Sequence, residues 1–311
     1  MKSTRTKLIT CILGIASLFS CQYQEEVIEP TTDTNNMTNY YDLLEEGLNT
    51  VFNDTYSNVT INTTFGEIAN MFEKNSKDFF ADKGFIVTDS DIAHTRGVYS
   101  SPFDNMNNLN ENQKAVVNKV TTILQLPIYN DVRLAISQLY EQTSSLPIQK
   151  GKEEILRYIK YIENILCLLE KEKGKIDVLN VLVKSNEFHE IKLNTRSGSV
   201  SLPDGMYPHP LDKNKFIMVV QGNVYEFSCG AGLVYCQSAG GCTYPDTCSG
   251  NGGPDGWWEK WGKCAAAILG GAGLEGLGGA GIGSVVPGLG TVTGAIIGAI
   301  SGAFTGAVAG C

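Results

Sequence analysis

The stretch KEEILRYIKYIENILCLLEKEK, residues 152–173, decides the fold. Its apolar side chains recur at intervals of three and four, which is the period of one face of an α-helix. They are Ile155, Leu156, Ile159, Ile162, Ile165, Leu166 and Leu169. The pattern predicts a long helix with one face in a hydrophobic core, ended by Gly174.

The segments before this helix carry the same period. Apolar residues at helical spacing predict further helices, and Pro127 and Pro147 end the last two. One start is marked by the capping box of Thr64 and Glu67. The four helices begin near Tyr41, Thr64, Asn110 and Val132. We therefore expect a mainly α fold in which residues 40–175 form a small antiparallel helical bundle.

Residues 176–228 have a different character. The run 176–183 is strand-like, although helix remains an alternative. Phe216–Val220 and Val224–Phe227 flank Gly222-Asn223, which predicts a β-hairpin. We expect a small β-rich region here.

Four cysteines lie close together in the glycine-rich segment 229–256. Two short disulfides are the expected way to hold such a segment, which is too small to build a core unaided. Zinc is the alternative, but the cluster has no C-x-x-C pair and no histidine. We therefore expect disulfides with an open pairing, and no metal or cofactor. The cysteines are Cys229, Cys236, Cys242 and Cys248.

The N-terminus has the features of an export signal. Lys2, Arg5 and Lys7 precede an apolar run, 8–19, that is short for a membrane span. The run ends in LFSC (18–21), which resembles the lipobox of bacterial lipoproteins. The resemblance implies a signal peptide at 1–20, acylation of Cys21, and anchoring in the outer membrane; the alternative is an ordinary cleaved signal. The acidic start of the segment 21–39, expected to be a flexible tether, resembles the surface-export signals of some Gram-negative lipoproteins.

Three tryptophans precede the apolar C-terminal tail. Trp257, Trp258 and Trp261 lie together with Lys260 and Lys263. Aromatic and basic residues beside a hydrophobic run are typical of a membrane interface, so we interpret the tryptophans as interface anchors. The alternative is that they fill a soluble core.

The tail from Cys264 to Cys311 predicts a glycine-zipper helical hairpin. Six glycines repeat at a spacing of four and form one ridge on a helix, which permits close helix packing. Pro287 divides the tail into arms of about 23 residues, a length that suits a bilayer. A fold at Pro287 places Cys264 and Cys311 at the same end of the hairpin, and we expect them to form a disulfide. Glu275 then needs a partner, a lumen or an oligomer axis. The ridge comprises Gly290, Gly294, Gly298, Gly302, Gly306 and Gly310.

Residues 257–311 also resemble a peptide family. The runs WGKCAA (261–266), GGAG (270–273), VPGLG (286–290) and GAVAGC (306–311) are similar to the class II glycine-zipper bacteriocins. This resemblance implies insertion into a target membrane, which then leaks. The implied partners are membrane lipid, further copies of the chain through the zipper, and an immunity or export partner of unknown identity.

The remaining classes of function are narrowed by charge and by missing motifs. A net charge of −9 disfavours nucleic acid as a partner. His94, His189 and His209 are scattered, and we find no nucleophile–base constellation, so we expect no enzyme. The leading hypothesis is a surface lipoprotein with a membrane-inserting hairpin. The alternatives are a structural or self-associating envelope lipoprotein, and a ligand-binding or adhesive lipoprotein that uses residues 176–248.

Overall fold

The computed structural model describes residues 40–84, 106, 109–147, 151–184, 190–192, 202–237, 240–248 and 256–277. The chain divides into two compact units, Met1–Asn36 and Met37–Cys311, and all the described residues belong to the second. The expected signal peptide, the lipidation site Cys21, the whole tether 21–39, and the glycine ridge with Pro287 lie outside the described residues.

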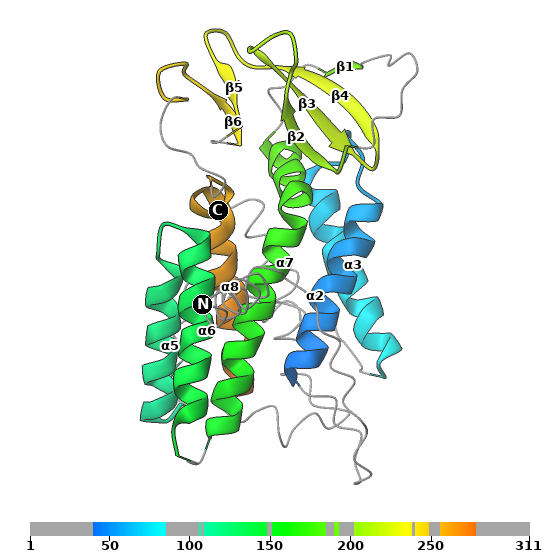
Figure 1. Cartoon of the computed structure of the whole chain (residues 1–311). Coiled ribbons are helices and arrows are strands. Elements are labelled where there is room, and N and C mark those ends of the chain that lie inside the picture. The colour runs from blue at the N-terminus through cyan, green and yellow to red at the C-terminus, as the bar shows by residue number, and fades with distance from the viewer. Residues whose placement is uncertain are drawn as a thin grey trace, which may run out of the picture. The chain divides into compact units, whose positions relative to one another are not determined.

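The described chain is mainly helical (Figure 1). Apolar faces bury at the expected period, and Leu44, Leu48 and Val117 are fully buried. Capping boxes are present at the N-caps Thr64 and Asn110. Both residues lie where the sequence predicts that a helix starts. The helices of the body are α2 (Tyr40–Ser57), α3 (Phe65–Asp82), α5 (Glu111–Leu124), α6 (Tyr129–Ser145) and α7 (Lys152–Lys184).

Helix α7 is the central element and is longer than predicted. It packs against α2, α5 and α6, and runs past Gly174 to Lys184. The strand-like interpretation of 176–183 is therefore wrong: Ile176, Leu179 and Leu182 bury one face of a continuing helix. Gly174 does not end the helix. Its lack of a side chain instead permits a close approach by the backbone of Asp204. A Cβ there would lie within 3.0 Å of the backbone oxygen of Asp204, so only glycine lets the next region approach this closely.

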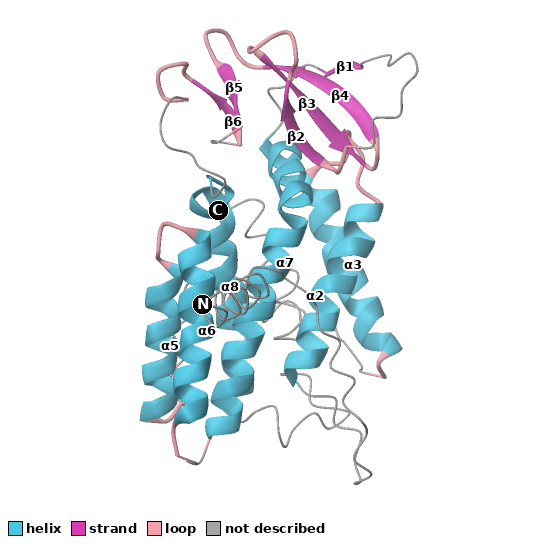
Figure 2. Cartoon of the chain, viewed as in Figure 1, coloured by secondary structure: helices cyan, strands magenta, loops and turns pink. Residues whose placement is uncertain are grey.

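A four-stranded antiparallel sheet lies at the C-terminal end of α7 (Figure 2). The predicted hairpin is present, but its turn is Gln221-Gly222, one residue earlier than expected, since Val220 pairs with Asn223. Both turn residues have positive φ, 50° and 72°, as a type I′ turn requires. The strand order is β1-β4-β3-β2, with β1 (Glu190–Lys192), β2 (Gly205–Pro208), β3 (Lys215–Val220) and β4 (Asn223–Ser228).

The chain then returns to the helical body. A π-helical turn, η1 (Trp258–Gly262), leads into α8 (Lys263–Ala272) and the short α9 (Leu274–Leu277). Helix α8 packs against α7 and α5, and its small side chains Ala265, Ala266 and Ala272 are buried there. Among the described residues, no helix is both long enough and apolar enough to cross a membrane.

The three tryptophans are part of this core. Trp257, Trp258 and Trp261 are 8%, 0% and 1% exposed, and their rings cluster with Tyr129. The indole Nε1 of Trp258 donates to the backbone oxygen of Leu126 at 2.9 Å. Their interpretation as membrane-interface anchors is therefore corrected: in this structure they fill the core of the body, because polar partners for two of the indoles are provided there.

Candidate functional site

Two disulfides hold the small β region together. They join Cys229 to Cys242 and Cys236 to Cys248, with Cα–Cα distances of 5.6 Å and 5.5 Å. The expectation of two disulfides among these four cysteines is confirmed, and the alternating pairing was not predictable from spacing. The disulfides brace a two-stranded hairpin, β5 (Val234–Cys236) and β6 (Gly241–Thr243).

The disulfide hairpin is fixed to the four-stranded sheet. The ring of Phe216 stacks on those of Phe227 and Tyr235, with centroids 5.3 Å and 5.2 Å apart. The backbone N–H of Tyr235 donates to the oxygen of Lys213 at 2.8 Å. Stacked aromatic rings and backbone bonds make this a preorganised scaffold rather than a loose loop.

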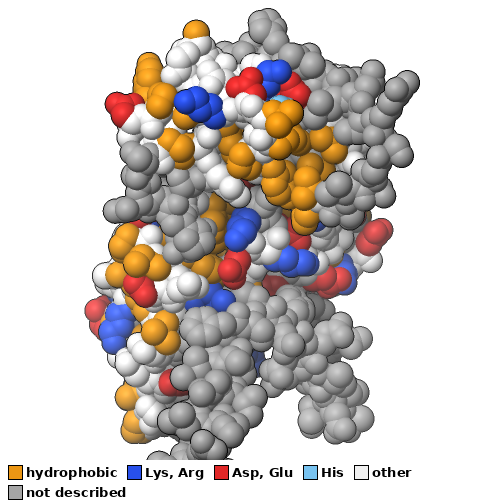
Figure 3. Space-filling model, turned by 45° about the horizontal axis from the view of Figure 1, so that its top comes forward, with side chains coloured by type: hydrophobic (Ala, Val, Ile, Leu, Met, Phe, Trp, Pro, Cys, Tyr) orange, Lys and Arg blue, Asp and Glu red, His pale blue; other side chains and the backbone are white. Residues whose placement is uncertain are grey.

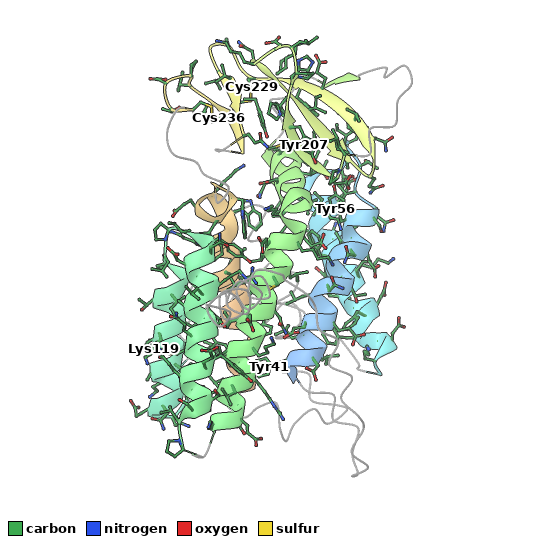
Figure 4. All side chains as sticks on the ribbon, viewed as in Figure 1. Tyr41, Tyr56, Lys119, Tyr207, Cys229 and Cys236 are labelled. Atoms are coloured by element: carbon green, nitrogen blue, oxygen red, sulfur yellow. A yellow bond between two sulfur atoms is a disulfide. The ribbon has the colours of Figure 1, made fainter. Side chains whose placement is uncertain are left out.

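A cavity of about 770 Å³ opens between this scaffold and the helical body. Figure 4 labels Tyr207, Cys229 and Cys236 at this strand-bearing end. The cavity wall combines aromatic and charged side chains, as pockets for small ligands do. The wall includes Tyr207, Tyr235 and Trp257 as aromatic members and Lys173, Asp177 and Asp204 as charged members.

Asp177 of α7 is a carboxylate of the wall whose side chain is only 19% exposed. Its Oδ1 accepts a hydrogen bond from Trp261 Nε1 at 3.0 Å and lies 4.0 Å from Lys260 Nζ. Burial raises the pKa of this carboxyl, and the Lys260 ammonium opposes that rise. Lys260 in turn donates to the backbone oxygen of Gly240 at 2.6 Å, which ties η1 to the disulfide hairpin.

The two tyrosines of the wall are neutral groups at physiological pH. Burial raises the pKa of Tyr235, and burial followed by the charge of Asp204 raises that of Tyr207. The Tyr207 hydroxyl donates to the backbone oxygen of Pro203 at 2.7 Å, which orients its ring. These phenols therefore offer hydrogen bonds and ring surface, not charge.

A second polar cluster on the sheet has a structural explanation. His209 Nδ1 accepts from the backbone N–H groups of Leu211 and Asp212 at 3.2 Å and 3.0 Å, so its proton lies on Nε2. Nε2 faces Glu226 at 3.3 Å, and Lys215 pairs with the same carboxylate. The cluster fastens the loop between β2 and β3. Within the described part of the chain, no group of three or more acidic, histidine or cysteine side chains could hold a metal ion.

The disulfide-braced β region is similar to a known family. Residues 200–249 match the family model of a chitin binding Peritrophin-A domain. The Peritrophin-A-like segment carries both disulfides and most of the cavity wall, yet spans well under half of the chain. Comparisons with curated proteins and with solved structures give no match.

The residues that the sequence singled out lie in different parts of the structure. Trp257 lines the cavity, whereas Trp258 and Trp261 lie in the core behind it. Cys264 is itself disulfide-bonded, but its partner lies outside the described residues, so its pairing with Cys311 stays a prediction. Glu275 lies in α9, and nothing is described of its side chain.

Sequence reasoning missed the tyrosines and the acidic members of the cavity wall. Tyr207 and Tyr235 flank the hairpin strands, and the aromatic residues interleaved with the four cysteines were the available signal. The role of Asp177 could not be predicted from the sequence, because this residue lies in a helix far from the cysteines along the chain.

Proposed function

We propose that this chain is an exported, non-enzymatic binding protein whose Peritrophin-A-like segment recognises a polysaccharide of N-acetylglucosamine, of which chitin is the simplest. The observation that carries the proposal is the family match to the disulfide-braced unit at 200–249. The chemistry of the neighbouring cavity supports it. Aromatic rings can pack against the apolar face of a sugar ring, and carboxylates accept hydrogen bonds from its hydroxyl and amide groups.

The rest of the chain would then present this segment. In this proposal Cys21 carries the lipid anchor, residues 21–39 span the distance from the outer membrane, and the helical body holds the binding segment. Figure 3 shows hydrophobic side chains gathered beside lysine and acidic side chains on the strand-bearing end. A surface of this mixed kind suits a polysaccharide, which has both hydroxyl groups and apolar ring faces, better than lipid.

Retention on chitin tests the proposal. The chain without its expected signal peptide and lipidation cysteine, residues 22–311, is passed over chitin beads and over cellulose beads, which lack the acetamido group. We expect retention on chitin alone and release by N-acetylglucosamine oligomers. Reduction of the disulfides should abolish retention, since the small segment depends on them. A chain that is folded by circular dichroism and yet flows through chitin would contradict the proposal.

The membrane-inserting hairpin is a separate proposal for residues 264–311, supported by the six glycines in register. Insertion of the first arm would require α8 to leave its buried contacts with α7 and α5. Those contacts support the envelope alternative, in which the tail packs against its own body. Dye release from liposomes by the oxidised chain, with Gly298→Leu and a reduced sample alongside, separates the two: leakage that is lost in both controls supports insertion.

A further inference from the structure

The wall of the cavity is not confined to the Peritrophin-A-like segment. Lys173 and Asp177 come from α7, and Trp257 comes from the start of the C-terminal helices, all outside residues 200–249. A segment that bound its ligand alone would have no need of these residues. The helical body therefore contributes part of the cavity wall.

The two sides of the cavity are held in register by direct contacts. Gly174 on α7 lies against the backbone of Asp204. The side-chain amide of Gln221 donates to the backbone oxygens of Tyr56 and Val59, both at 2.8 Å. Lys260 joins η1 to Gly240 of the disulfide hairpin. Together these contacts fix the sheet and the disulfide hairpin against the helical body, as a preformed site requires.

Asp177 has hydrogen-bonding capacity left over. Its contacts with Trp261 and with Lys260 both involve Oδ1. Oδ2 therefore has no hydrogen-bond partner among the described residues, although the side chain is only 19% exposed. A carboxylate oxygen at a cavity wall that is partly exposed and lacks a protein partner is suited to accept a hydrogen bond from a ligand.

The remaining wall supplies what the other parts of an amino sugar need. The acetamido group of N-acetylglucosamine combines an N–H donor with a methyl group. Trp257 and Met206 offer apolar surface for the methyl group and the ring face, in the same cavity as the acceptor on Asp177. At about 770 Å³ the cavity falls within the usual range for small-ligand pockets, about 300–1,000 Å³.

We propose that the cavity is a composite saccharide site, in which Asp177 of α7 accepts a hydrogen bond from a bound N-acetylated sugar and Trp257 provides an apolar wall. The helical body is then a working part of the binding site and not only a support. This inference rests on the proposed function, and it goes beyond the segment that the family match covers.

Calorimetric titration of the chain 22–311 with triacetylchitotriose tests the composite site. Asp177→Asn keeps the acceptor for Trp261 but replaces the other oxygen by an NH₂ donor. We expect at least a tenfold loss of affinity, as for a hydrogen bond to a charged group. Glu259→Gln is the matched control, because Glu259 lies in η1, is half exposed and forms its ion pair with the neighbouring Lys263, away from Asp177. It should bind as the wild type does.

A second variant guards against an unstable Asp177→Asn. Gln237 is exposed at the cavity wall, so Gln237→Trp should block the cavity without disturbing the core, and should also weaken binding at least tenfold. Tyr244→Ala probes the outer face of the segment, where Tyr244 is 64% exposed. Loss in Asp177→Asn and Gln237→Trp with Tyr244→Ala unchanged supports the composite site. If the first two bind within twofold of wild type, the composite site is overturned and the proposed function stands; if the wild type fails to bind chitin or the trisaccharide, both fall.

Discussion

The substitution Gly174→Ala tests the contact that joins the β region to the body. In an unobstructed helix interior, alanine is more favourable than glycine by about 1 kcal/mol. At Gly174 the added Cβ would come within 3.0 Å of the backbone oxygen of Asp204, which no side-chain rotation can relieve. Overpacking of this kind costs about 1–3 kcal/mol. Taking the upper end for a rigid backbone atom, we expect a net loss of about 2 kcal/mol in the free energy of unfolding.

Thermal and urea unfolding, followed by far-ultraviolet circular dichroism, measure this loss. For a body of this size about 2 kcal/mol lowers the melting temperature by about 4–8 °C. The matched control is Gly66→Ala in α3, because a Cβ there meets nothing within 4 Å. It should be neutral or slightly stabilising. If Gly174→Ala raised the melting temperature as the control does, α7 and Asp204 would not be in contact and the cavity would lose one of its walls.

Three further substitutions test other parts of the structure. Gly273→Ala should lose about 1–3 kcal/mol in urea unfolding, because its Cβ would lie 2.6 Å from a buried tyrosine ring; no loss would mean that α8 is not packed as described. Trp258→Ala should lose about 3–5 kcal/mol, since the ring is 0% exposed; a membrane-anchoring tryptophan would leave the unfolding of the body in water unchanged. Glu45→Gln should flatten the pH dependence of stability. Burial raises the Glu45 pKa to about 7, so its stabilising contribution is complete below the unfolded value of about 4.3 and is lost as the pH rises towards 7. Relative to wild type, the variant should gain stability between pH 5 and pH 8, and an unchanged difference would refute this assignment.

The helices of the body were predictable because their signals are local. Periodic apolar residues such as Leu44 and Leu48 bury as their spacing requires. The capping box at Thr64 marks a helix start in the sequence and in the structure alike. The need for disulfides followed equally from local composition, since a glycine-rich segment with four cysteines has no core of its own.

The errors arose where a distant part of the chain decides the outcome. Run 176–183 fits both an alternating and a helical pattern, and packing within the body selects the helix. Gly174 was predicted to end the helix because glycine is a common residue there. The contact that explains this glycine is made with Asp204, thirty residues further along the chain, and the local sequence does not reveal it. The tryptophans share their basic surroundings with membrane-interface residues. Only their partners, the backbone of Leu126 and the side chain of Asp177, distinguish a core from an interface.

The start of the tail shows how one residue pattern can suit two environments. Small residues in α8 let a neighbouring helix approach closely, in lipid or in a protein core. The last carbonyl groups of a helix need donors from elsewhere, and here the body provides them. Tyr161 donates to the oxygen of Leu269 at 2.8 Å, and Tyr158 donates to that of Gly270 at 3.4 Å.

Those hydroxyl groups have a consequence for the membrane proposal. A helix that enters lipid must satisfy its backbone internally or through neighbouring helices, because no water is present there. Leaving the body would cost α8 these two bonds and would leave Tyr158 and Tyr161, both 0% exposed, beside a vacated space. The first arm is therefore bound to the body by specific polar contacts as well as by close packing. Any insertion of the tail must exchange these contacts for lipid, so it must depend on the stability of the body and not on the hydrophobicity of the tail alone.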